Sequence, residues 1–341
     1  MKEIAIIGLD LAKNILQVHG ADASGVPVLK KRLRRDQVLP FFAGLRPCKV
    51  AMEACSGAHY WAREIARLGH ETRLIPPAYV KPFVKRQKND AADAEAICEA
   101  AQRPTMRFCA VKSAKQQAAA AGFRARDLLV RQRTQLINAL RGHLYEYGVA
   151  VPKGAAHAGR LVELVEEGSA APAEAALALR CLAEALKALE EKIRLLDREI
   201  AERAKEDALA RRLMTIPGIG AITATALAAL APPMETFSRG RDFAAWLGLV
   251  PRQHSSGGKD RLGKTTRMGE RSLRRLLVIG AAGVVRWSLR KPPRPDSWLG
   301  RMLARKPRQL VAVALAGKMA RIIWALITKE ENYRALSVSA A

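Results

Sequence analysis

Short apolar runs and alternating segments dominate the pattern of hydrophobic and polar positions in residues 1–111. The run Ile4–Asp10 is apolar and ends in an acid, as is typical of a buried strand. Residues 15–19 alternate and are followed by turn-forming residues at 22–25, which predicts a hairpin. Further strands are expected at 48–55 and 72–75, and helices at 37–45, 59–68 and 89–101, the last capped by Asn89.

Residues 112–206 follow a helical period instead. Glycine and proline are sparse, and two long helices are expected at 113–147 and 172–206, separated by a loop at 148–159. The second helix carries a stripe with three-four spacing: Leu182, Leu186, Leu189, Ile193, Leu196 and Ile200. This stripe fits the seam of a coiled coil or helical hairpin and fits an ordinary bundle core equally well. Both interpretations make the region a spacer or assembly arm.

Residues 207–330 predict a third, mainly helical region, followed by a tail at 331–341. The segment Ile216–Ile222 looks like the turn of a helix-hairpin-helix, in which glycine amides approach a phosphate at a helix N-terminus. A loop at 250–269 and helices at 270–290, 296–303 and 307–328 complete the expectation. The predicted fold class is therefore α/β plus α.

The charge of the chain indicates a polyanionic partner. Lys and Arg number 58 against 32 Asp and Glu, which gives a net charge of +26. Soluble chains this basic usually bind nucleic acid, although a ribosome-associated or membrane-surface protein is the alternative. The five cysteines form no C-x-x-C pair and no signal peptide is visible, so we expect free thiols and a cytoplasmic, nucleoid-associated protein.

The longest uncharged run, Leu213–Met234, does not suggest a membrane helix. Pro217, Pro232 and Pro233 interrupt it, and most of the remaining residues are weakly apolar alanine. We expect a soluble pair of helices here and no membrane partner.

Four acids form the first candidate site. Asp10 ends the first strand, Glu53 lies in the second apolar strand, and Asp90 and Asp93 share one face of a helix start. Acids in apolar strands need a compensating charge, and Mg²⁺ (or Mn²⁺) is bound by such hard oxygen ligands. Taken singly, each acid could instead form a salt bridge, lie at a solvent edge or favour a helix N-terminus.

The motifs around these acids resemble a known family. "GLDLAKN", "MEACSG" and "KNDAADAEAI" are similar to the first domain of bacterial insertion-sequence transposases of the DEDD recombinase family, which are related to site-specific DNA invertases. The resemblance covers nearly the whole chain. It implies a ribonuclease-H-like domain similar to Holliday-junction resolvases at 1–111, with Asp10, Glu53, Asp90 and Asp93 as its metal-binding tetrad. It also implies a structured guide RNA and assembly into dimers or a tetramer.

A serine loop is the second candidate site. Between Arg252 and Arg275 the chain carries eight Lys or Arg residues around a Ser-Gly-Gly sequence. A serine hydroxyl there could attack a phosphodiester, but a basic Ser/Gly surface turn is the alternative, and His254 is a weak candidate for its general base. The resemblance implies a P-x₄-S-G signature, which places the catalytic serine of the 207–330 transposase domain at Ser256, with Ser255 as the competing neighbour.

Basic residues of this loop and of the long helices are candidates for nucleic-acid contacts. We predict such contacts for Arg124, Arg131, Arg252, Lys259, Arg261, Lys264, Arg267, Arg271 and Arg274. Trp287 and Trp298 lie among the Lys and Arg residues of 286–308. They could stack on nucleobases or belong to the core.

The leading hypothesis is a metal-dependent transposase that cuts and rejoins double-stranded DNA at element ends and target. A structure-specific endonuclease using the same four carboxylates without Ser256 is the alternative. A non-catalytic nucleic-acid-binding scaffold is the third hypothesis, and it predicts that loss of Asp10 has no effect.

Overall fold

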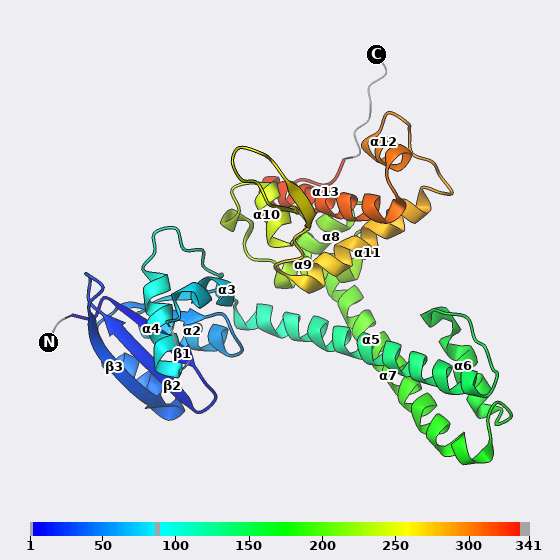
Figure 1. Ribbon diagram of the computed structural model, residues 1–341, viewed down its shortest axis with the longest axis horizontal. Coiled ribbons are helices and arrows are strands. Elements are labelled where there is room, and N and C mark those ends of the chain that lie inside the picture. Colours follow the sequence, from blue (N-terminus) through cyan, green and yellow to red (C-terminus); the bar gives the residue numbers. More distant parts are fainter. Residues whose placement is uncertain (1–2, 86–88, 335–341) are drawn as a thin grey trace. The chain divides into compact units, whose positions relative to one another are not determined.

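The computed structural model describes residues 3–85 and 89–334 of the chain, which divides into two compact units (Figure 1). The N-terminal unit comprises residues 1–117 and the C-terminal unit residues 118–341. Each unit has its own hydrophobic core.

A five-stranded mixed sheet forms the centre of the N-terminal unit. Its order is β3-β2-β1-β4-β5. The strands are β1 (Ile6–Leu11), β2 (Ile15–Ala21), β3 (Pro27–Arg34), β4 (Lys49–Glu53) and β5 (Glu71–Ile75). Strands β1, β2 and β3 are antiparallel neighbours, whereas β4 runs parallel to both β1 and β5. The carboxyl ends of β1, β4 and β5 therefore meet at one edge of the sheet.

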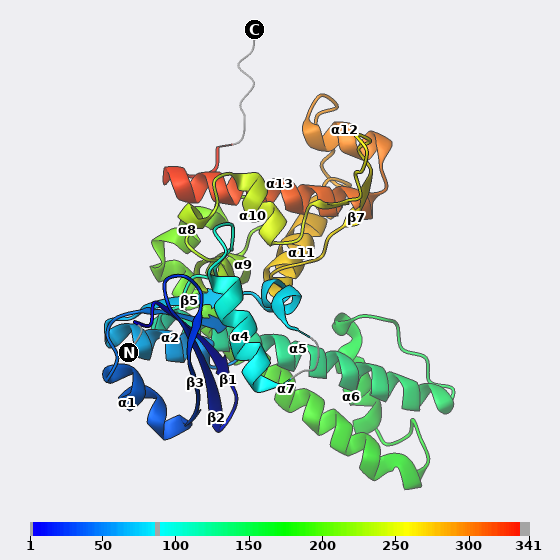
Figure 2. The same ribbon diagram turned by 60° about the vertical axis from the view of Figure 1, so that its left-hand side comes forward.

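Helices cover both faces of this sheet. Helices α1 (Val38–Ala43) and α2 (Ala58–Arg67) pack on the face that presents Ile7 and Leu9. Helix α4 (Asp90–Ala101) packs on the opposite face, across β1 and β2 (Figure 2). A short helix α3 (Pro77–Val80) and two 3₁₀ turns at 35–37 and 81–83 complete the unit.

The strands and helices predicted for this unit are confirmed, including the Asn89 cap, whose side chain accepts a hydrogen bond from the Ala92 amide. The extent of β3 was not predicted. Its sequence PVLKKRLR carries four cations and no acid, so its apolar alternation is weak. Cations suit this strand because it lies at the edge of the sheet, where charged side chains discourage pairing with another chain.

The C-terminal unit contains two long helices that pack side by side as an arm. Helices α5 (Ala114–Glu146) and α7 (Ala173–Glu206) confirm the two predicted long helices, and α5 begins in the N-terminal unit. In the stripe on α7, the members at seven-residue spacing are buried: Leu186, Ile193 and Ile200. Their partners Leu182, Leu189 and Leu196 are half-buried. The stripe is therefore the seam of a helical hairpin.

Helix α6 (Ala158–Glu166) packs between the ends of α5 and α7 and was not predicted. Its apolar residues Leu161, Val162 and Val165 are buried against both long helices. Glycine and proline interrupt the helical period at 148–159 and predict a loop there. The amphipathic segment that follows is too short to stand out from this loop.

Six further helices lie in the described part of the C-terminal unit, residues 118–334. They are α8 (Ala208–Met214), α9 (Ala221–Leu230), α10 (Gly240–Trp246), α11 (Arg271–Trp287), α12 (Trp298–Arg305) and α13 (Arg308–Lys329). The predicted loop at 250–269 contains two short strands, β6 (Pro251–Gln253) and β7 (Leu262–Thr265), which pair as an antiparallel hairpin. This hairpin is polar and rich in glycine, so its sequence lacks the alternation of apolar and polar residues that predicts strands.

Helix α13 has the length and composition of a membrane-spanning helix, with a mean hydropathy of 1.9. It is the one helix in residues 3–85 and 89–334 that meets both conditions. The run Leu213–Met234, considered above, instead forms α9 and its flanking turns. Helix α13 packs against α10 and α11, and Val311, Ala316 and Ile323 are fully buried. These contacts identify α13 as a core helix.

Candidate active site

Close packing between β1 and α4 brings two strand acids and a helix terminus together. A Cβ added at Gly8 would lie 2.2 Å from the Ala94 carbonyl oxygen and 2.5 Å from the Cys98 amide nitrogen. Side chains alternate along a strand, so Asp10 lies on the same face of β1 as Gly8. Glu53 lies on the same face of β4 as Ala51, which contributes to the core under α4. Both acids therefore lie on the α4 side of the sheet.

The first turn of α4 supplies the other two acids. Asn89 caps the helix, and Asp90 and Asp93 follow in the first turn, with Asp90 exposed and Asp93 half-buried. Acids are favoured at this position by the helix macrodipole. The charges of Asp93 and Asp90 both act on Asp10, so this first turn lies near the end of β1 that carries Asp10.

The pKa of Asp10 shows that the four carboxylates interact. It rises from 3.8 to about 6. Burial contributes most, followed by repulsion from Asp93 and then from Asp90, while the charge of Glu53 adds a smaller share. A hydrogen bond from the Leu11 backbone opposes the rise. Concentrated negative charge of this kind is what a bound cation would relieve.

The donor set suits a divalent cation, although its side chains are not closed around one. All four groups are hard carboxylate oxygens, the ligands that Mg²⁺ prefers. Across residues 3–85 and 89–334, no three His, Cys, Asp or Glu side chains are already arranged to hold a metal ion.

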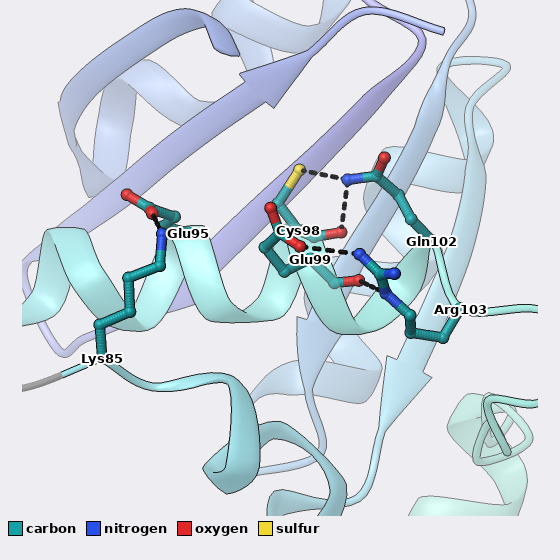
Figure 3. A network of polar contacts seen from close by, with 6 residues as sticks. All are labelled: Lys85, Glu95, Cys98, Glu99, Gln102 and Arg103. Atoms are coloured by element: carbon teal, nitrogen blue, oxygen red, sulfur yellow. Dashed lines mark hydrogen bonds and ion pairs between the residues drawn. The ribbon is translucent and has the colours of Figure 1, made fainter. Parts of the chain in front are cut away.

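Polar contacts on the rest of α4 fix the helix in place (Figure 3). The Lys85 ammonium donates a 2.5 Å hydrogen bond to Glu95, and this contact lowers the pKa of Glu95. Arg103, just beyond the end of the helix, donates to Glu99 at 2.9 Å. The charges beyond the first turn are thus paired locally.

The serine segment forms the tip of the β6–β7 hairpin. Gly257 and Gly258 have φ values of +56° and +76°, and the Lys259 amide donates to the Ser256 carbonyl at 3.1 Å. Two successive residues with positive φ between paired residues define a type I′ turn, which requires glycine at these places. The Ser-Gly-Gly-Lys sequence is therefore a tight turn that presents Ser256 at its first corner.

The two serines have different surroundings. The Ser255 hydroxyl donates to Asp260 at 3.2 Å and accepts from the Arg261 amide at 3.1 Å. Ser256 is exposed, and its main-chain carbonyl accepts the hydrogen bond from the Lys259 amide. Ser255 therefore braces the hairpin, whereas the hydroxyl of Ser256 faces solvent.

The base of the hairpin is closely packed. The Arg274 guanidinium donates to the carbonyl oxygens of Leu247 at 2.9 Å and Met268 at 2.7 Å. A Cβ at Gly269 would lie 1.7 Å from the Trp246 carbonyl oxygen, so a side chain cannot be accommodated there. Arg274 thus clamps the two ends of the hairpin together.

The other predicted nucleic-acid contacts are exposed. This set comprises Arg124, Arg131, Arg252, Lys259, Arg261, Lys264, Arg267 and Arg271. Arg274 differs from them because it is half-buried and engaged with backbone carbonyls. Trp287 is 60% exposed, so the core interpretation is wrong for it, whereas Trp298 lies under the Lys318 ammonium at 4.8 Å.

The glycine turn between α8 and α9 packs against α11. Cβ atoms added at Gly218 and Gly280 would each lie within 2.7 Å of the other residue's carbonyl oxygen. The sequence predicted this turn as part of a helix-hairpin-helix, and the phosphate contact of that motif stays a prediction. The tight packing gives Gly218 a structural function.

Gly8, Asp260 and the clamp of Arg274 were not predicted from the sequence. Gly8 could have been found as the small residue one strand period before Asp10. Asp260 is one of two acids in a basic loop, which is itself an unusual feature. The partners of Arg274 carry no sequence signal, because backbone carbonyls accept its hydrogen bonds.

Two family models match the chain. A model described as "Transposase IS116/IS110/IS902 family" matches residues 210–294. A second, for the DEDD domain of IS110-type proteins and described as "Transposase", matches residues 7–149 and so includes all four acids.

Curated relatives match along almost the whole chain. A "Probable family 20 transposase" of Pseudomonas aeruginosa is 51% identical, covering 96% of this chain and 98% of the relative. The transposase for insertion sequence element IS1328 of Yersinia enterocolitica is 42% identical over the same shares. The transposase for insertion sequence element IS1111A of Coxiella burnetii is 40% identical, covering 98% of this chain and 92% of the relative. The chain therefore belongs to the IS110/IS116 family of insertion-sequence transposases.

Proposed function

We propose that this transposase cuts and rejoins DNA between the ends of a mobile element and a target, using four carboxylates and a serine. The observation that carries the proposal is the convergence of four carboxylates at Asp10. Burial, and after it the charges of Asp93, Asp90 and Glu53, raises the pKa of Asp10 to about 6. The sheet order and the α4 packing also support a ribonuclease-H-like (RuvC-like) domain at 1–111. We further propose an assembly region at 112–206 and a transposase domain at 207–330.

The carboxylates would hold a divalent cation, since DEDD transposases normally use such ions. Asp10 and Glu53 are presented by rigid strands and Asp93 by a capped helix, so three ligands come from fixed elements. We propose Mg²⁺ or Mn²⁺. A bound ion would supply charge neutralisation at the scissile phosphate and favour ionisation of an attacking hydroxyl.

The serine step is a phosphoryl transfer. The Ser256 oxygen forms a bond to phosphorus while one phosphodiester P–O bond breaks, and the serine proton passes to the departing strand end as its hydroxyl. Attack by the hydroxyl of another strand end on the phosphoserine restores Ser256 and joins the strands. No cofactor is consumed, because the serine ester conserves the phosphodiester bond.

A structured guide RNA and assembly into dimers or a tetramer are further parts of the proposal. The net charge of +26 and the exposed cations of the serine hairpin support binding of nucleic acid beyond one DNA duplex. A matching test is to degrade copurified RNA with ribonuclease before the reaction. We expect this treatment to abolish joining, and unchanged joining would contradict RNA guidance.

The principal experiment is an excision assay in cells. The gene with its native flanking DNA is placed on a plasmid, and the junction of the expected circular product is amplified. We expect junctions from the wild type and from Ser169→Ala, a control at an exposed loop serine, and none from Asp10→Ala or Ser256→Ala. Junctions from Ser256→Ala would exclude the serine mechanism, and cleavage without joining would favour the endonuclease hypothesis.

A further inference from the structure

A hollow of about 760 Å³ opens on the face of the N-terminal unit opposite α4. Segments from three parts of the chain line it, and they include Asn14, Ile15, Arg34, Arg35, Tyr60 and Trp61. Its volume lies in the range of small-ligand sites, which is about 300–1,000 Å³. None of the residues assigned above to the carboxylate site or the serine hairpin belongs to this hollow.

The hollow combines an exposed ring with a fixed cation. The Tyr60 ring is 41% exposed, and its edge-to-face contact with Trp61 has a centroid distance of 5.2 Å. The Arg35 guanidinium lies 5.0 Å from the Trp61 centroid. Trp61 is buried in the core, so it acts as a platform that orients both neighbours. An aromatic ring beside an oriented guanidinium suits a nucleobase and its phosphate.

Charge around the hollow favours a polyanion. Four of the eight residues of β3, which ends at the hollow, are Lys or Arg, and none is acidic. The lining acid Asp36 lies 3.5 Å from Arg34 in a pair that is exposed on both sides. Exposed ion pairs contribute little energy, so Arg34 can exchange Asp36 for a phosphate at low cost.

The hollow lies within reach of the carboxylate site. Asn14 follows Asp10 by four residues, a separation that spans at most about 14 Å in an extended chain. Tyr60 lies in the first turn of α2, the helix that follows the carboxyl end of β4, and β4 carries Glu53. Two chain segments therefore connect the hollow directly to the strand ends that carry Asp10 and Glu53.

We propose that this hollow binds an unpaired nucleotide of the DNA strand that is cleaved at the tetrad, with its base on Tyr60 and its phosphate at Arg34 and Arg35. The identity of the strand rests on the proposed function. An unpaired nucleotide is required because a base inside a duplex has no free face for the ring. The hollow would thereby set the register of the strand relative to the metal ligands.

The test uses the full chain and a single-stranded oligodeoxynucleotide that carries 5-iododeoxyuridine, irradiated in EDTA. We expect mass spectrometry to find the cross-link at Tyr60. Tyr60→Ala should raise the Kd for the unmodified oligonucleotide on the order of tenfold, as loss of one stacked base does. Tyr60→Phe keeps the ring and should bind as the wild type does. Tyr79→Ala, at a tyrosine 42% exposed on α3, is the matched control and should have no effect.

Arginine variants test the phosphate contact. Arg35→Gln should weaken binding severalfold, whereas Arg46→Gln, at an exposed arginine outside the hollow, should not. Duplex DNA and single-stranded RNA of the same sequence serve as further probes. Wild-type affinity in Tyr60→Ala, or dependence on Tyr60 with the duplex or the RNA alone, would overturn the proposal.

The outcome is separable from the proposed function. Asp10→Ala should retain the Tyr60 cross-link while losing junction formation. If the wild-type protein gives the Tyr60 cross-link but forms no junction, recombination is contradicted and the hollow remains a nucleotide site. Junction formation that survives with no cross-link at Tyr60 would contradict the hollow alone.

Discussion

Gly8 of β1 lies against Cys98 of α4 so closely that a Cβ on Gly8 would come within 2.5 Å of the Cys98 amide nitrogen. This contact sets the distance of α4 from the sheet, and with it the position of Asp90 and Asp93 relative to Asp10. Gly8 has no reactive side chain, but its small size therefore determines how closely the carboxylates of α4 approach Asp10.

We predict that Gly8→Ala destabilises the protein by about 1–3 kcal/mol, the usual cost of overpacking a core. Transposition should fall by more than this loss of stability explains, because α4 must move away from β1. Gly142→Ala is the control, since an added Cβ there would meet no atom within 4 Å in the described part of the chain. It should be neutral or more stable by about 0.5–1 kcal/mol, as alanine is in a helix. Thermal denaturation and the junction assay measure both variants, and equal effects would contradict this prediction.

The raised pKa of Asp10 predicts a dependence of stability on pH that is opposite to the usual one for an acid. Between pH 3.8 and about 6 the folded protein binds the Asp10 proton more tightly than the unfolded chain does. Ionised Asp10 therefore destabilises the metal-free fold above about pH 6, and this effect disappears near pH 4. Asp10→Asn should melt at a higher temperature than the wild type at pH 7.5 in EDTA and at the same temperature at pH 4. A difference that is independent of pH would contradict the assignment.

The same ionisation should control the affinity for metal. A cation competes with the Asp10 proton below about pH 6, so the apparent affinity for Mn²⁺ should fall about tenfold for each further pH unit. Calorimetric titration between pH 5 and 7.5 would measure this slope. A flat profile would show that Asp10 is not among the ligands.

Arg274 and Arg271 should differ although they are three residues apart on one helix. Arg274→Met removes two hydrogen bonds at the base of the serine hairpin and should reduce joining at least tenfold, with little change in DNA affinity. Arg271→Ala, at an exposed position, should weaken DNA binding and reduce its salt slope by about one. Binding isotherms at several salt concentrations separate the two effects. Identical slopes and activities in the two variants would refute the distinction.

Ser255 and Asp260 should act as a pair that braces the hairpin. Ser255→Ala and Asp260→Asn each remove part of one hydrogen-bonded unit and should each lower the joining rate by about tenfold or less. The double variant should be no worse than the more affected single variant. An SDS-stable protein–DNA adduct should still form in both, whereas Ser256→Ala should form none. An adduct that depends on Ser255 would reverse the assignment of the two serines.

Local signals explain why most of the fold could be predicted. The strands that carry Asp10 and Glu53 are short apolar runs, and Asn89 is a capping residue placed directly before the helical period. The long helices are continuous periodic stretches. Each of these features depends on neighbours in the sequence, which is why single-sequence reasoning finds it.

Features that combine distant segments could not be predicted. The hollow needs residues 14–15, 34–40 and 60–61 to meet, and Gly218 needs Gly280 as its counterpart. The hairpin of Ser256 is specified by two glycines with positive φ and by Asp260, in a segment with no hydrophobic alternation. Sequence patterns report which face of an element is buried, but not which other element buries it.

The contribution of α13 to the C-terminal core has a consequence for the timing of synthesis. Residues 1–117 form a compact unit of their own, whereas the core that supports the serine hairpin includes Ile323 and Leu326. At a synthesis rate of about 5–20 residues per second, the roughly 200 residues between these points take about 10–40 s to translate. A nascent chain would thus display its carboxylates well before it could position Ser256. On the proposed mechanism, strand joining would begin only after translation is nearly complete.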